Sequence, residues 1–274
     1  MKRRRARFLR HRLGMAGGVV VAVMLLAAAG APLWRTQDPL AMQMSQSLQP
    51  PTPQHWFGTD EFGRDVWSRV VYGARLSITV GLASMLLATA AGVPLGAAAG
   101  YAGGTFDALA MRCMDAILAF PGLLLAIGLV AALGLGTGSG IIAIGVVYVP
   151  VFARVTRGAV LVRRQEEYVE AARALGQTDL AILRRHVLPN CLAPVLVQAT
   201  LGFASAIVID AGLSFLGAGT PPPAPDWGTM LNEARQFMVS APHVAVFPGL
   251  AISLAVLGFN LLGDGLRDAL DPRL

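Results

Sequence analysis

The side chains best suited to act on another molecule lie in one charged segment, EYVEAARALGQTDLAILRRHVLPN at residues 167 to 190. Carboxylates and guanidinium groups alternate there, and the segment contains no serine, no cysteine and a single histidine. Charged side chains of this kind form ion pairs and hydrogen bonds with a partner surface, whereas nucleophilic catalysis needs a base beside a nucleophile. The segment therefore predicts docking rather than catalysis.

The segment also has the pattern of two short helices joined at Gly176. Glu166, Glu167 and Glu170 favour a helix start, and Gly176 supplies a C-cap turn. Thr178 or Asp179 can cap the second helix, and Pro189 ends it. Apolar residues recur at helical spacing in both helices: Tyr168, Ala171, Ala172 and Leu175, then Leu180, Leu183 and Val187. An interfacial helix lying on lipid is the alternative, but the acidic cluster and the Ala-Ala pair favour docking to a protein.

No constellation for catalysis or metal binding is evident. Lys2 is the only lysine, so no phosphate-binding G-x-x-x-x-G-K-[ST] loop exists, and H-E-x-x-H and G-x-S-x-G are absent. The four histidines are scattered, and Cys113 and Cys191 match no zinc spacing. We therefore predict no catalytic residue, no metal and no cofactor in this chain, and we place any ATP chemistry on another polypeptide.

Two aspartates inside apolar stretches are candidates for a pathway or pore lining, because charge in lipid is costly and often functional. Asp115 has Arg112 three residues before it, so a local ion pair at the membrane edge is the simpler interpretation. Asp210 is expected near the outer end of its span. It could contact a peptide amino group, an arginine of a neighbouring chain, or water.

These residues belong to a chain that is 55% hydrophobic and 14% charged, which is typical of an integral membrane protein. A span needs about 20 apolar residues. We predict an all-α fold with six transmembrane helices at 15–34, 77–99, 114–133, 138–156, 191–212 and 242–263. A Gly-rich stretch at 133–140 separates the third and fourth, so five spans is the alternative. The repeat of Gly92, Gly96 and Gly100 predicts close helix packing.

Basic residues concentrate before the first span and in the 157–190 segment, which the positive-inside rule places in the cytoplasm. Six spans then put both termini in the cytoplasm and residues 35–76 and 213–241 outside. We interpret the first apolar run as an uncleaved anchor rather than a signal peptide. Its basic flank predicts contact with membrane lipid, not with nucleic acid.

The 167–190 segment resembles the EAA motif in the membrane subunits of ABC importers. Glu170-Ala171-Ala172, three residues, Gly176, nine residues and a closing Leu188-Pro189 reproduce its spacing. His186 stands where the general motif has isoleucine, which resembles the dipeptide, oligopeptide and nickel branch. Three more stretches resemble the C-type permease of that branch: HWFGTDEFGRDVWSRVVYGARLS at 55–77, LSFLGAGTPPPAPDWGTML at 213–231 and FNLLGDGLRDALDPR at 259–273.

This resemblance implies a type I ABC importer permease fold in the bacterial inner membrane. Residues 1–76 would form the basic N-terminus, first helix and outer segment, and 77–274 a five-helix core with its coupling loop at 157–190. The implied partners are a homologous permease, two ATP-binding subunits that carry ATP and Mg²⁺, and an extracytoplasmic solute-binding protein. The implied ATPase-coupling residues are Glu170, Ala171, Ala172, Gly176, Asp179, Leu188 and Pro189.

The transported solute stays open between dipeptides, longer peptides, glutathione and nickel complexes. A self-sufficient secondary carrier would need an internal repeat or intramembrane ion sites. A membrane enzyme would need a nucleophile, base or metal cluster. Neither pattern is evident, so an importer permease is the interpretation that the sequence favours.

Overall fold

The computed structural model describes residues 11–270, which fold into helices with no strand beyond a single bridge between Thr59 and Asp65. The long helices are α2 (Arg12–Ala29), α4 (Val66–Ala102), α5 (Gly104–Leu118), α6 (Gly122–Leu133), α7 (Thr137–Arg163), α10 (Leu192–Phe215) and α12 (His243–Leu270). The basic cluster from Lys2 to Arg10 and the end of the last family motif, Asp271 to Arg273, lie outside the described residues.

Five helical runs in this part of the chain are long and apolar enough to cross a membrane: α2, α4, α7, Asp179–Phe215 and α12. The remaining predicted span, the third at 114–133, is not one continuous helix. It is the pair α5 and α6, bent by 90° between Leu118 and Gly122. Pro121 explains the break, because proline has no N–H to donate and disfavours helical backbone in the residue before it.

The centre of the molecule is the crossing of α4 and α7, where the predicted Gly-x-x-x-Gly packing is confirmed. A Cβ atom on Gly92 would lie 2.6 Å from the carbonyl oxygen of Val149, and one on Gly96 would collide with Ala153. Further along, Gly100 faces the backbone of Arg157. Side chains at these positions would force the helices apart.

Helix α4 begins at Val66, well before the expected start of the second span at residue 77, so the division at 76/77 falls within this helix. The apolar pattern does not reveal this start, because the charged residue Arg69 lies in the first turns of the helix and interrupts the apolar run. Its guanidinium group is 1% exposed and lies 3.1 Å from Glu233 and 3.4 Å from Asp60. Asp65 caps the helix by accepting a hydrogen bond from the N–H of Ser68.

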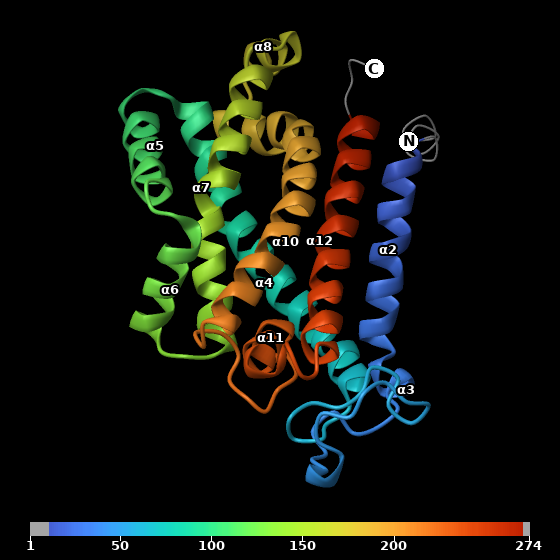
Figure 1. Cartoon of the computed structure of the whole chain (residues 1–274). Coiled ribbons are helices and arrows are strands. Elements are labelled where there is room, and N and C mark those ends of the chain that lie inside the picture. The colour runs from blue at the N-terminus through green and yellow to red at the C-terminus, as the bar shows by residue number, and fades with distance from the viewer. Residues whose placement is uncertain (1–10, 271–274) are drawn as a thin grey trace.

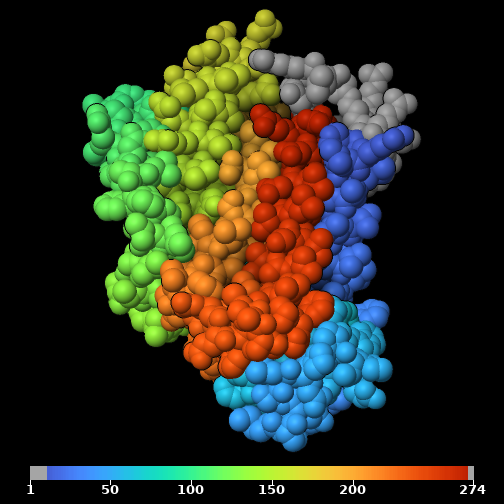
Figure 2. All heavy atoms as spheres, in the orientation of Figure 1, coloured from blue at the N-terminus to red at the C-terminus, as the bar shows by residue number. Residues whose placement is uncertain are grey.

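One end of the bundle carries a projecting helix, and the opposite end is covered by an irregular segment (Figure 1). Helix α8 (Glu167–Ala174) projects from the same end as the first residue of α2 and the last of α12. The irregular segment 35–65, with a 3₁₀ turn at Met44–Gln46, closes the opposite end beside α11 (Trp227–Ala234). Figure 2 shows α10 as a strip between α7 and α12 on one face of the molecule.

Candidate functional site

The candidate site is the segment between α7 and α10. Helix α7 continues to Arg163, so residues 157–163 of the predicted loop are helical and the connection begins at Arg164. Helix α8 follows at Glu167–Ala174, with Glu167 and Glu170 in its first turn. Negative side chains there are favoured by the partial positive charge of the helix N-terminus.

Gly176 ends α8 in a Schellman motif. Its backbone φ is +77°, and its N–H donates to the carbonyl oxygen of Arg173 at 3.0 Å, while the N–H of Gln177 donates to Ala172 at 3.2 Å. This pairing satisfies carbonyl groups that the end of a helix otherwise leaves open. Apart from its own neighbours in the chain, no atom of residues 11–270 lies within 4 Å of the place a Cβ would occupy on Gly176, so the backbone conformation, not space, requires glycine here.

The second helix is capped by Thr178, whose Oγ1 accepts a hydrogen bond from the N–H of Ala181 at 3.4 Å. It runs as α9 (Asp179–Ile182), a π-helical turn (Leu183–Val187) and a 3₁₀ turn (Leu188–Cys191) directly into α10. Pro189 occupies the start of that 3₁₀ turn. His186 Nε2 lies 2.9 Å from Gln177 Oε1, which fastens the second helix to the turn after the first.

One side of this segment faces the body of the protein. Val169, Ala172, Ile182 and Val187 are buried and form a small apolar cluster with Val160 of α7. The expectation that Ala172 faces a partner is therefore wrong, because Ala172 is 5% exposed and packs inward. Burying this side fixes the position of both short helices relative to α7.

The other side is apolar and open. Leu175 is 81% exposed, Leu180 is 62% exposed, and Tyr168, Ala171 and Glu170 are also exposed. We call Tyr168, Ala171, Leu175 and Leu180 the outer face of the segment. Large apolar side chains exposed together on a rigid support are typical of a protein interaction surface.

Asp179 joins the segment to the end of α4. Its Oδ1 accepts a hydrogen bond from the Tyr101 hydroxyl at 2.8 Å and lies 3.7 Å from Arg173. Hydrogen bonding of Arg173 itself to Tyr101, and the charges of Tyr101, Asp179 and Glu170, raise the pKa of Arg173. These contacts brace α8 and α9 against α4.

The two aspartates proposed for a pathway lie in different surroundings. Asp115 of α5 contacts Arg154 of α7, rather than the expected Arg112, and both side chains are about half exposed. Asp210 is 4% exposed. It lies within electrostatic reach of Asp226, the N-cap of α11. Burial raises the pKa of Asp226. Hydrogen bonds from Thr229, Ser214 and Gly228 lower this pKa, but the effect of burial is larger.

A second charged group, which the sequence alone does not predict, lies at the opposite end of the bundle. Carboxylate oxygens of Asp60, Glu61 and Glu233 approach within 4.8 Å of one another. The guanidinium groups of Arg64 and Arg69 lie among them, with Arg64 2.6 Å from Asp60 and 2.9 Å from Glu233. Two arginines already balance most of this negative charge, so the group is an ion network that fixes the segment 35–65 to α4 and α11. Burial raises the pKa of Glu61.

The described residues thus form a bundle of membrane-spanning helices with an exposed, braced apolar face at one end, which is typical of a subunit of a larger membrane assembly. The chain belongs to the family of binding-protein-dependent transport system inner membrane components, whose model matches residues 92–274. Residues 1–51 match the N-terminal transmembrane domain of oligopeptide transport permease C. The family is one of importer permeases, which confirms the interpretation from the EAA motif.

Curated relatives extend the match over nearly the whole chain. The dipeptide transport system permease protein of Alkalihalophilus pseudofirmus is 48% identical over 265 residues, covering 97% of this chain and 87% of the relative. The glutathione transport system permease protein of Pectobacterium atrosepticum is 45% identical over 269 residues, covering 98% and 89%.

Among solved structures, a chain of the MetNI methionine ABC transporter in an inward-facing conformation matches with a TM-score of 0.62. It has 19% sequence identity and covers 74% of this chain and 96% of that chain. The predicted type I importer permease fold is thereby confirmed. Membership of the family makes this a multi-pass inner-membrane protein that works with a partner permease, an ATPase and a binding protein.

Proposed function

We propose that this chain forms half of the pore of an ATP-driven importer of peptides, and that residues 164–191 couple it to an ATPase subunit. The observation that carries the proposal is the outer face, because it is apolar, exposed and held rigid from behind. A helix that passes on the movement of a partner must itself be held rigidly in place. The buried apolar cluster beneath the segment, the turn at Gly176 and the hydrogen bond between Asp179 and Tyr101 hold it so.

In this mechanism two ATP-binding subunits, which carry ATP and Mg²⁺, close upon each other and displace α8 and α9. Since α9 continues into α10 and α8 follows α7, the displacement reaches both spanning helices directly. The bundles then shift between inward and outward openings, with solute delivered by an extracytoplasmic binding protein. Glu170 stands exposed on α8 for contact with the partner, and Leu188 and Pro189 mark where the segment re-enters the bundle.

The orientation we propose places α8, both termini and the Arg-rich segment in the cytoplasm, as the positive-inside rule requires. The segment 35–65 and α11 then lie outside, where they contribute to docking of the binding protein. Residues 1–76 and 77–274 remain our proposed division into an entry portion and a permease core. Asp115, with Arg154 beside it, and Asp210 are our candidates for the pathway.

Peptides are the solute class favoured by the dipeptide permease of Alkalihalophilus pseudofirmus, and glutathione, itself a small peptide, is the second candidate because of the Pectobacterium relative. The test is uptake into proteoliposomes that contain the two permeases, with and without the ATP-binding subunits. We expect dipeptide uptake only when those subunits, the binding protein and ATP are present. Uptake by the permeases alone would overturn the proposal.

A further inference from the structure

Two buried aspartates, Asp210 and Asp226, lie at the contact between α10 and α11 (Figure 1). Asp210 is 4% exposed and Asp226 is fully buried. Gly228 packs directly on α10, since a Cβ atom there would lie 2.7 Å from Cα of Ala211 and 2.8 Å from Cβ of Ser214. Ser214 follows Asp210 by one helical turn on the same face of α10. Asp226, two residues before Gly228, therefore stands beside the face of α10 that carries Asp210.

Neither aspartate has a positively charged partner in the described part of the chain. No ion pair among residues 11–270 includes Asp210 or Asp226. Oδ2 of Asp226 accepts a hydrogen bond from the N–H of Thr229 at 2.9 Å, whereas Oδ1 is buried and meets no hydrogen-bond partner within these residues. A buried acceptor of this kind requires a donor that the described residues do not supply.

The helices that pack against this contact carry several titratable side chains in the same half of the bundle, and these side chains have other partners. They are Arg69 and Arg64 in the ion network with Asp60, Glu61 and Glu233, Arg75 over the ring of Tyr72, Arg235 over the ring of Phe215, His243 beside the carbonyl oxygen of Thr59, and Tyr148 beside Ser205. The compensating charge for the two aspartates must therefore come from a ligand.

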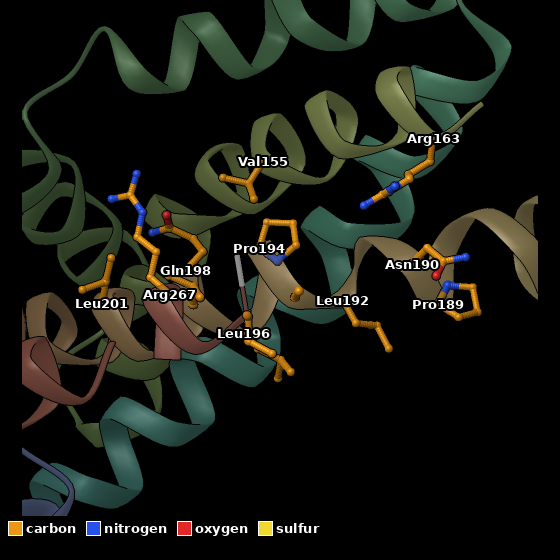
Figure 3. Close-up of a pocket in the computed structure, with 13 residues that line it drawn as sticks. Val155, Arg163, Pro189, Asn190, Leu192, Pro194, Leu196, Gln198, Leu201 and Arg267 are labelled. Carbon is orange, nitrogen blue, oxygen red and sulfur yellow. The ribbon is translucent and has the colours of Figure 1, made fainter. Parts of the chain in front are cut away.

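Two carboxylates in one buried site cannot both stay ionised at low cost, because their repulsion adds to the loss of hydration. A proton is the smallest ligand that removes this repulsion, and it turns one carboxylate into a donor for the other. A larger ligand would need an opening. The cavity of about 690 Å³ beside α10 does not provide one, because the residues of α10 that line it end at Leu201 (Figure 3). Asp210 lies nine positions beyond Leu201, about 13 Å at a rise of roughly 1.5 Å per residue.

We infer that Asp210 and Asp226 together form a site for one proton, which holds α11 against α10. The hydrogen bond from Thr229 favours the ionised form of Asp226, so the proton resides on Asp210 and is donated toward Oδ1 of Asp226. Asp210 would then serve the pathway through the position of α11 and not by touching the solute.

The experiment is infrared spectroscopy of the assembled importer in detergent at neutral pH, where the C=O stretch of a protonated carboxyl group is separate from that of a carboxylate. We expect Asp210→Asn to remove the signal of one protonated carboxyl group per copy of this chain. Asp210→Ala should give the same loss and keeps the test available if the asparagine variant does not assemble. Asp264→Asn, at an exposed aspartate of α12, is the matched control and should remove none.

Thermal unfolding gives a second readout. The folded pair keeps a proton that the unfolded chain releases above a pH of about 3.9, so its contribution to stability is lost as the pH rises. The unfolding midpoint of the natural importer should therefore fall more steeply between acidic and alkaline pH than that of Asp210→Asn, whose amide is a donor at every pH. Asp264→Asn should follow the natural protein.

An unchanged protonated-carboxyl signal in both variants at residue 210, or parallel pH profiles of the natural protein and Asp210→Asn, would overturn the inference. So would a midpoint that sodium or calcium ions raise at constant ionic strength in the natural protein and not in Asp210→Asn, because the site would then hold a metal cation. Neither measurement involves solute or ATP, so both are independent of the proposed function.

Discussion

The hydroxyl group of Tyr101, in the last turn of α4, donates a hydrogen bond of 2.8 Å to Oδ1 of Asp179, the first residue of α9. These residues are 78 positions apart, and their contact fastens the 164–191 segment to a helix that does not adjoin it in the chain. In the proposed mechanism, a movement of α9 would therefore reach α4 as well as α10.

Tyr101→Phe should loosen this connection while leaving the fold intact. A hydrogen bond of this kind contributes roughly 1 kcal/mol, so we expect the amount of solute transported per ATP hydrolysed to fall by up to about fivefold. Parallel measurement of uptake and phosphate release in proteoliposomes checks this. Tyr72→Phe, in the same helix but at its other end, is the control. An unchanged transport ratio in Tyr101→Phe would show that the contact transmits nothing.

Gly176→Val should uncouple solute transport from ATP hydrolysis, because valine disfavours the backbone conformation of this turn. A β-branched residue at a φ of +77° costs roughly 1–2 kcal/mol. In the described part of the chain the added Cβ meets no atom beyond the adjacent residues. Gly176→Asn should retain most activity, because asparagine tolerates this region. Gly128→Val, on a helical residue in open space, serves as the control. Normal uptake and normal ATPase binding by Gly176→Val would contradict the role assigned to this turn.

Much of this architecture follows from sequence patterns, and the exceptions have physical causes. Apolar runs predict spans, but hydropathy alone does not show that Pro121 turns the third span by 90°. Helical spacing places Ala172 on the face with Ala171, yet only the folded chain shows that the body of the protein covers one edge of that face.

Ion pairs between helices cannot be predicted from the sequence alone, because their two members lie far apart in the chain. Asp115 meets Arg154, 39 residues away, because the bend in the third span lays α5 against α7. Arg69 is accommodated in a spanning helix because Asp60 and, across 164 residues, Glu233 of α11 lie beside its guanidinium group. A single sequence carries no signal for such pairings.

Arg69→Met tests the outer ion network. Removing Arg69 leaves Arg64 as the one arginine among the carboxylates of Asp60, Glu61 and Glu233, and loss of a partner from a buried ion group costs about 3–5 kcal/mol. We expect a clearly lower midpoint of thermal unfolding for the purified importer. Arg75→Met, an exposed arginine in the same helix, should leave the midpoint within error. Equal midpoints for the two variants would mean that the network does not stabilise the fold.

Glu61→Gln should change how stability depends on pH. Burial raises the pKa of Glu61 in the folded state, so the folded protein binds the proton more tightly than the unfolded chain does. The contribution of protonated Glu61 to the free energy of unfolding is fully present below the ordinary glutamate pKa of about 4.3. It is lost as the pH rises through the pKa that Glu61 has in the folded protein. At about pH 7 the variant should therefore be as stable as the natural protein or more so. Thermal unfolding across this range checks the sign, and a less stable variant at neutral pH would contradict it.

The central claim is that the outer face of residues 164–191 meets an ATPase subunit. Cysteine cross-linking in the assembled importer, after Cys113→Ser removes the exposed native thiol, tests it most directly. Leu175→Cys should form an adduct with the ATPase subunit whose yield changes on adding ATP. Leu135→Cys, at a residue 70% exposed beyond the end of α6 against 81% for Leu175, should form none. An ATPase adduct at Leu135→Cys, or none at Leu175→Cys, would contradict the account.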